Sequence, residues 1–248
     1  MSAQKQFSHG LRAQLSYTFS RAVDDSSGVN SQDYTDGSPY VLDFYDRKAD
    51  RGLSTFWAQH VFVGSWSYEL PFAKSMTGAG AVLLKGWQLN SITTVQTGHP
   101  FEVRLGFNRS GNLNTVNYAM HERPDVKPGF SNNPILGDPA RWWDVNAFQL
   151  QPANQRGNLG RNTLIGPSIV DFDLSLAKYF AIDEKRKFEF RAEAFNLPNH
   201  PNFSVPSGLT AFTGVGANGN PNIAPNWGVI STTVTTSRQV QFGLKFIF

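Results

Sequence analysis

The sequence predicts an all-β fold: an antiparallel transmembrane β-barrel fragment of about six strands with three long extracellular loops. Three observations support this prediction: an aromatic, weakly charged composition, apolar residues at every second position, and connections that alternate between short and long. Aromatic residues make up 13% of the 248 residues and charged residues only 17%, against about a quarter in soluble domains. The longest apolar run, Ala79 to Leu84, is far shorter than the roughly 20 residues of a spanning helix.

The first three strands are expected at roughly 10–22, 56–72 and 86–105. In the first, odd positions from Leu11 to Phe19 are apolar and the even positions between them are polar, which is the period of a two-faced strand. In the second, Phe62, Trp66, Tyr68 and Leu70 share one face, and Val61 and Val63 interrupt the polar face opposite. The third is the weakest, because Ile92 lies on the wrong face, and Gly98 with Pro100 predicts a bulge or bend.

The last three strands, roughly 170–182, 187–197 and 237–248, alternate more cleanly. Their even positions are mostly Phe, Leu, Val and Ala, and their odd positions are mostly charged or polar. Each strand is close to the length of about 9–11 residues that a tilted strand needs to span a membrane. Because facing residues of an antiparallel pair share a face, we expect Leu176 to face Ala192 or Ala194.

The connections alternate in length. Long polar stretches occupy roughly 23–55, 106–169 and 200–236, whereas the turn Asp183–Arg186 and the segment Ala73–Gly86 are short. Short turns at one rim and long loops at the other are typical of outer-membrane barrels, and such long loops count against a compact soluble domain.

Aromatic residues gather at the rim of the short turns. They are Tyr68, Phe72, Trp87, Tyr179, Phe180, Phe188, Phe246 and Phe248. A soluble sandwich also has alternating strands, but it gives no reason for aromatics at one set of strand ends. A membrane–water interface does, because it favours amphipathic rings.

Charged residues line the polar face of the fourth and fifth strands. Asp171 and Asp173 share this face with Glu189, Arg191 and Glu193. Paired carboxylates also occur in hydrolases. Barrel interiors are polar, however, and cross-strand charge pairs stabilise sheets, so we expect a lumen-facing polar ladder.

The second long loop holds two candidate surface groups. Arg141, Trp142 and Trp143 could bind a ligand or lipopolysaccharide, or could pack the loop, and packing is favoured. Asn158 and Arg161 lie in a glycine-rich stretch that resembles a phosphate cradle. No strand-to-helix pattern follows it, so we expect its glycines to let an extracellular loop fold tightly.

Composition also excludes several functions. The chain has no Cys, and its 22 basic and 19 acidic residues are interspersed without a basic stripe, so neither thiolate chemistry nor nucleic-acid binding is expected. The five His residues show no ligand spacing; they are His9, His60, His99, His121 and His200. We expect no enzyme activity, no metal and no cofactor.

The last strand carries a second kind of signal. Apolar residues alternate to the end of the chain at Val240, Phe242, Leu244, Phe246 and Phe248. This pattern resembles the signal that outer-membrane barrels present to their assembly machinery, although any docked terminal β-strand could show it. With Phe248 at the periplasmic rim, the long loops fall on the extracellular side.

Six stretches resemble the barrel of Oar-like TonB-dependent receptors and together cover nearly the whole chain. They are SYTFSRAVDD (16–25), DRGLSTFWAQHVFVGSWSYELPF (50–72), GWQLNSITTVQTGHPF (86–101), GNLGRNTLIGPSIVDFDLSLAKYF (157–180), FRAEAFNLPNHPNF (190–203) and RQVQFGLKFIF (238–248). The stretch from Gly157 through Phe203 is the most specific. Relatives usually have Arg where this chain has Gln59.

The resemblance implies a place and a role. Relatives combine a signal peptide, an N-terminal domain, a plug and a barrel of about 22 strands. The first ten residues lack the apolar core of a signal peptide, so the whole chain, 1–248, is expected to be the C-terminal part of such a barrel. Its implied role is uptake of a large solute across the outer membrane.

The implied partners are outer-membrane lipid and lipopolysaccharide, the barrel assembly machinery, the missing N-terminal strands and plug, and through these the TonB energy-coupling complex. The polar ladder is expected to touch the plug. Alternatives are a surface adhesion or structural barrel and a soluble all-β carbohydrate-binding domain. The sequence does not identify the substrate.

Overall fold

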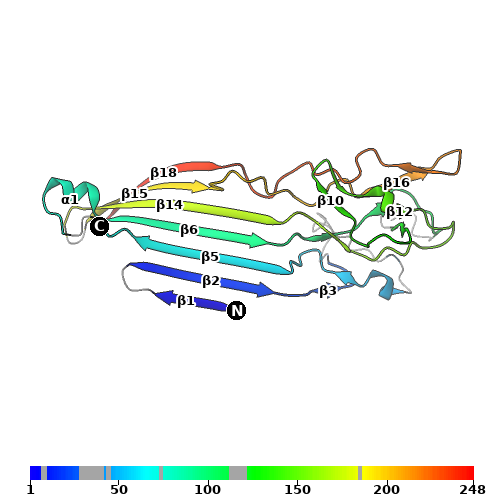
Figure 1. The fold of residues 1–248 in the computed structure, drawn as a ribbon, viewed down its shortest axis with the longest axis horizontal. Coiled ribbons are helices and arrows are strands. Elements are labelled where there is room, and N and C mark those ends of the chain that lie inside the picture. The colour runs from blue at the N-terminus through cyan, green and yellow to red at the C-terminus, as the bar shows by residue number, and fades with distance from the viewer. Residues whose placement is uncertain (7–9, 28–41, 43–45, 73–74, 112–121, 184–185) are drawn as a thin grey trace.

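The chain forms one long sheet with a compact region at one end (Figure 1). The structure, a computed structural model, describes residues 1–6, 10–27, 42, 46–72, 75–111, 122–183 and 186–248. Outside these lie His9, His121, part of the first long loop, and Glu184 and Lys185 of the predicted short turn.

Seven strands form the long sheet, and every neighbouring pair is antiparallel. In spatial order they are β1 (Ser2–Gln6), β2 (Leu11–Phe19), β5 (His60–Glu69), β6 (Trp87–Gln96), β14 (Ile169–Ala181), β15 (Lys187–Phe195) and β18 (Gln239–Ile247). Spatial order follows chain order, so the sheet is an up-and-down meander. The predicted all-β antiparallel class is confirmed, although β1 and β18 do not pair and no closed barrel results.

The strand registers bring most of the large apolar side chains to one face, with Val61, Val63 and Ile92 among the exceptions on the other. Leu176 faces Ala192 and Leu89, which confirms the predicted even register between the fourth and fifth strands. We call this side the apolar face; it carries the odd positions of β2 and β6 and the even positions of β5, β14, β15 and β18. The opposite side is the polar face.

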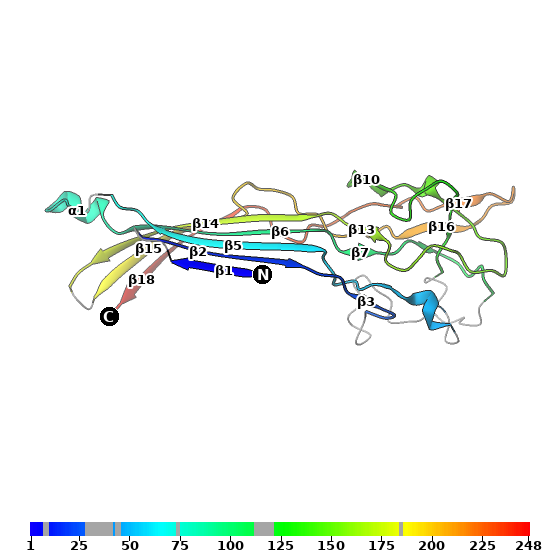
Figure 2. The same ribbon diagram turned by 60° about the horizontal axis from the view of Figure 1, so that its bottom comes forward.

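The two faces differ in exposure. On the apolar face, Phe242 and Leu244 are each 72% exposed, and no second protein layer covers them. On the polar face, Glu189 is 4% exposed. Figure 2 shows β15 and β18 bending out of the plane of the other strands. Because the polar face buries Glu189 whereas the apolar face is exposed, the polar face is the inner side of this bend. Phe-rich surfaces therefore point outward, contrary to a soluble sandwich.

The third predicted strand is shorter than 86–105. The chain leaves the long sheet after Gln96, and β7 (Pro100–Phe101) and β8 (Arg104–Leu105) join other sheets. A Cβ at Gly98 would lie 1.8 Å from the carbonyl oxygen of Gly166, so only glycine permits this close crossing of two backbones.

The long loops fold together into a region that we call the cap, which consists of the described residues of 20–58, 97–168 and 196–238 (Figure 1). Its short strands are β3 (Val23–Asp24), β4 (Gly52–Leu53), β9 (Asp125–Val126), β10 (Ile135–Asp138), β11 (Arg141–Trp143), β12 (Phe148–Gln149), β13 (Leu164–Ile165), β16 (Thr210–Val215) and β17 (Pro221–Ile223), with β7 and β8. It also holds the 3-10 turns η1 (Arg47–Asp50) and η3 (Val145–Ala147). β8 and β16 pair in parallel.

The hydrophobic core lies in the cap and not in the long sheet. Its buried members are Phe101, Val103, Leu105, Trp143, Val145, Ala147, Phe148, Leu159, Leu164, Ala211 and Phe212. They come from 101–105, 143–164 and 211–212, so the second and third predicted loops pack together around one core.

The opposite end of the sheet carries the short connections. Arg186 and Asp183 close the β14–β15 turn with an ion pair of 2.5 Å. The β5–β6 connection holds α1 (Ala79–Leu84). Over the described ranges no helix is long and apolar enough to cross a membrane.

Candidate functional site

The predicted polar ladder lies on the polar face of β14, β15 and β18. Arg191 forms ion pairs with both neighbours on its own strand, Glu189 and Glu193, the latter at 3.7 Å. Because side chains two positions apart in a strand point the same way, the arginine links the two carboxylates into one row.

Adjacent strands extend this row. The Tyr179 hydroxyl donates to Glu189 Oε1 at 3.4 Å, and Gln241 Nε2 donates to Glu193 Oε2 at 2.6 Å. The ladder therefore spans three strands.

The two aspartates of the ladder lie nearer the cap. Asp173 Oδ1 accepts a hydrogen bond of 2.9 Å from the backbone N–H of Asn196, just beyond β15. Asp171 Oδ1 is buried, and no described residue donates to it. Neither aspartate forms an ion pair with Arg191 among the described residues.

A groove of about 410 Å³ runs along this part of the polar face. Its walls include Asn90, Asp173, Tyr179, Glu189 and Arg191. The groove is open to one side, and its lining mixes charged, amide and hydroxyl groups with the side chain of Ile92. Such a surface can bind a polar protein segment through charge-assisted hydrogen bonds.

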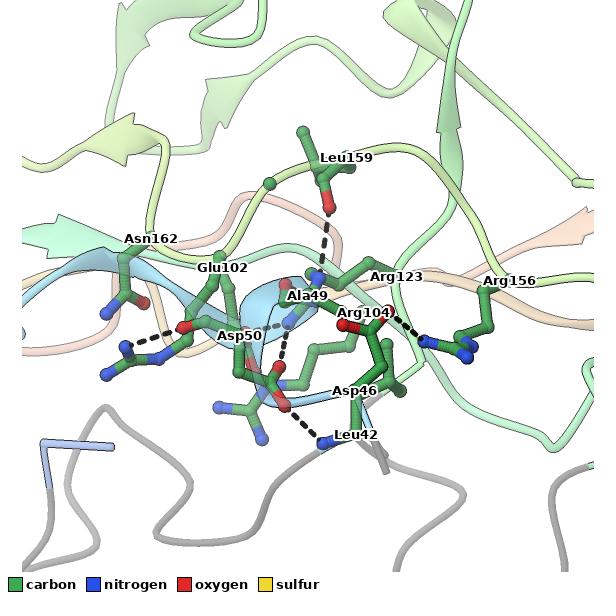
Figure 3. Close-up of polar contacts among 12 residues, drawn as sticks. Leu42, Asp46, Ala49, Asp50, Glu102, Arg104, Arg123, Arg156, Leu159 and Asn162 are labelled. Atoms are coloured by element: carbon green, nitrogen blue, oxygen red, sulfur yellow. Dashed lines mark hydrogen bonds and ion pairs between the residues drawn. The ribbon is translucent and has the colours of Figure 1, made fainter. Parts of the chain in front are cut away.

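A buried ion-pair network joins the loops of the cap (Figure 3). Arg123 Nη1 lies 3.0 Å from Asp50 Oδ1 and 3.6 Å from Glu102 Oε2. The remaining guanidinium nitrogens donate to the carbonyl oxygens of Leu159 at 3.0 Å and Ala49 at 2.8 Å. One buried cation thus connects three segments that are far apart in the sequence.

Arg161 forms a second node beside the first. Its Nη1 donates to Asp24 Oδ1 at 2.7 Å and to the carbonyl oxygen of Asp50 at 3.1 Å, and its Nη2 donates to Ser27 Oγ at 2.6 Å. Burial opposes the ionisation of Asp24, but hydrogen bonds from Ser54, Arg161 and Ser27 and the charge of Arg161 outweigh it. The pKa of the Asp24 carboxyl is therefore lower than its ordinary value.

The loop group Arg141–Trp143, for which packing is favoured over ligand binding, contacts other parts of the cap. Trp143 is fully buried, with its ring edge-on to Phe148 at 5.6 Å, and Trp142 donates its indole N–H to the carbonyl oxygen of Ile165. Arg141 lies with its guanidinium carbon 4.9 Å from the centroid of the Trp227 ring. These three residues therefore pack the cap.

Asn158 and Arg161 also bind other parts of the cap. The side-chain oxygen of Asn158 accepts from the N–H of Val126, while its own N–H donates to Asp125, both at 2.8 Å. A Cβ at Gly157 would lie 1.9 Å from the Arg123 carbonyl oxygen, which explains the glycine beside it.

The apolar residues of β18 form an exposed row. Val240, Phe242, Leu244 and Phe246 are 44–72% exposed, and Phe248 beyond the strand is 90% exposed. The row continues onto β15, because Phe188 of that strand faces Phe246 of β18. Their ring centroids lie 5.0 Å apart.

Sequence reasoning missed Arg123, Asp50 and Glu102. Arg123 and Asp50 lie 73 positions apart, so no local spacing marks them as partners. The described residues hold no group of three or more metal-binding side chains.

An antiparallel wall with an outward apolar face, a polar inner face and long loops at one rim defines the wall of a membrane β-barrel. A family model described as "Outer membrane beta barrel domain" matches residues 1–241. The chain belongs to this family, and its location is the outer membrane. No curated protein and no solved structure matches the chain.

Proposed function

We propose that the chain is the C-terminal part of the barrel wall of a TonB-dependent transporter, which takes up a large solute across the outer membrane. The polar groove along β14 and β15 is the observation that supports this role best. A plugged barrel needs a charged inner wall against which the plug packs, and the Glu189–Arg191–Glu193 row supplies one. The similarity of six stretches to Oar-like receptors gives the transporter class.

In this proposal the long-loop rim faces the cell exterior and the short-turn rim faces the periplasm, as in other outer-membrane barrels. The apolar face contacts outer-membrane lipid and the cap contacts lipopolysaccharide. Further strands would close the sheet beyond β1 and β18. The plug would respond to the TonB complex, and the apolar row of β18 would be recognised by the assembly machinery. The role is non-catalytic.

A surface adhesion or structural barrel is the second candidate, because the cap has its own hydrophobic core and could present a firm surface to another cell. The two roles differ in their need for energy. Transport requires TonB and the proton gradient, whereas adhesion requires neither.

The test compares cells that lack the gene, cells that lack TonB, and cells with an Arg191→Glu variant. For growth on candidate large solutes, we expect the first two to show the same defect. Arg191→Glu places three acidic side chains in one row, so plug packing and uptake should fall while the amount of barrel in the membrane stays unchanged. Uptake independent of TonB, or unaltered by the charge reversal, would count against the proposal.

A further inference from the structure

A short apolar helix projects from the short-turn rim (Figure 1). Helix α1 lies between β5 and β6, and its last three side chains are exposed: Val82 by 58%, Leu83 by 66% and Leu84 by 48%. Phe72, before the helix, is 58% exposed. A six-residue helix is far below the about 12–15 residues that form a marginal helix alone in water, so surrounding contacts must hold it.

The helix is attached on the side of the apolar face. Trp87 opens β6 at an apolar-face position, opposite Lys178 of β14, and its indole Nε1 donates to the carbonyl oxygen of Leu83 at 2.9 Å. Figure 2 shows α1 on one side of the sheet end while β15 and β18 bend to the other. Because the polar groove lies inside that bend, α1 continues the apolar surface.

A buried lysine fixes the end of the helix. Lys178 is the one residue with a charge among the apolar-face positions of β14, and it is 2% exposed. Its Nζ donates to the carbonyl oxygen of Lys85, directly after α1. The same nitrogen lies 5.6 Å from the Trp87 ring centroid and 4.8 Å from that of Phe180.

These contacts explain the position of the helix. Carbonyl groups at a helix C-terminus carry partial negative charge and attract a cation, and aromatic rings attract it as well. The helix end therefore shelters an ammonium group that would otherwise face the apolar surroundings of the sheet. In turn, the lysine holds Val82, Leu83 and Leu84 beside that surface.

We propose that α1 is an interfacial anchor, which lies in the bilayer leaflet next to the short-turn rim with Val82, Leu83 and Leu84 among the acyl chains of phospholipid. Its apolar surface is continuous with the outward face of an outer-membrane wall. Phe180, Phe188 and Phe246 face one another across β14, β15 and β18 at this end of the sheet. Interfacial segments bury apolar side chains at the boundary of headgroups and acyl chains and keep cations near the headgroups; here the six residues of α1 are all apolar, and Lys85 directly after them supplies the cation.

The chain contains no Cys, so single-cysteine labelling tests this proposal directly. Leu83→Cys in the full chain carries a polarity-sensitive fluorophore in vesicles of phosphatidylethanolamine and phosphatidylglycerol. The matched control is Thr77→Cys, an exposed polar position of the same connection. Phe242→Cys, in the apolar face of β18, shows that the wall has inserted.

Nitroxide-bearing phospholipid should quench the label at Leu83 at least about twofold more than the label at Thr77, and aqueous iodide should give the opposite order. Two outcomes overturn the proposal when the Phe242 label is quenched by lipid. One is iodide quenching at Leu83 as strong as at Thr77, which places the helix in water. The other is protection from both quenchers, which places a protein surface over it.

Discussion

At the residue scale, the cap is held by a few buried charges. Arg123, Asp50 and Glu102 are each 1–4% exposed. Arg104 lies 3.3 Å from Glu102, so two cations balance the two carboxylates. Buried ion pairs add little over apolar packing, but removal of one partner leaves an uncompensated charge. The network is therefore a strict constraint on how the loops fit together.

The substitution Arg123→Met should destabilise the cap by about 3–5 kcal/mol, because Asp50 loses its cation while it stays buried and Glu102 keeps only Arg104. The measurement is urea unfolding in detergent micelles, with trypsin cleavage within the cap as a second readout. The control is Arg47→Met, whose partner Asp25 lies at 2.6 Å but whose side chains are 66% and 42% exposed. That change should cost about 1 kcal/mol or less, and equal losses would show that burial does not matter here.

The Asp24–Arg161 pair predicts a pH dependence. Because the folded pKa of Asp24 is lower than its ordinary value, its ionised form adds stability above the unfolded pKa, about 3.9. This contribution is lost as the pH falls through the folded pKa. Pepsin is the suitable protease, because trypsin is inactive at such pH. As the cap loses this stabilisation, pepsin should cut the wild-type cap increasingly below about pH 4. Asp24→Asn should be cut at a rate that changes less over the same range.

At the element scale, six of the seven strands of the long sheet could be predicted from sequence, whereas those of the cap could not. β14 and β15 have clean alternation, and their faces and the Leu176–Ala192 register follow from it. β1 was missed because SAQKQ contains a single apolar residue. Strands of two or three residues, such as β8 and β13, exist only through contacts that sequence periodicity does not contain.

An asparagine side chain helps to define the start of β14, which the alternation of apolar residues does not mark. Asn202 accepts from the N–H of Val170 at 2.8 Å and donates to its carbonyl oxygen at 3.0 Å. Its amide thus pairs like a backbone group at the start of β14. The asparagine was visible in the stretch NLPNHPNF, but its partner 32 positions away was not.

The two faces of β18 should respond differently to charge. Phe242→Arg places a cation in the middle of the apolar face and should cost about 2–4 kcal/mol in a bilayer. Gln241→Arg is the matched control, because Gln241 already contacts Glu193 on the polar face and a cation there gains a partner. The measurement is urea unfolding from vesicles. Similar losses for both variants would contradict the assignment of faces.

At the scale of the whole molecule, the wall and the cap are two different kinds of structure. The wall exposes its apolar residues and the cap buries its own, so composition alone predicts neither. Alternation and loop length predicted the wall, its two faces and its membrane location. The cap network, with its contacts between residues 24 and 161 or 50 and 123, depends on how three loops meet beyond one end of the sheet.

This division predicts which parts are accessible from outside the cell. Asn218 lies between β16 and β17 at the far end of the cap, and Thr77 lies in the connection that holds α1 (Figure 1). Since the chain lacks Cys, Asn218→Cys should react with a membrane-impermeant maleimide on intact cells, and Thr77→Cys should react only after the outer membrane is permeabilised. The opposite pattern would invert the proposed orientation of the sheet, because loops and short turns lie at opposite ends of the same strands.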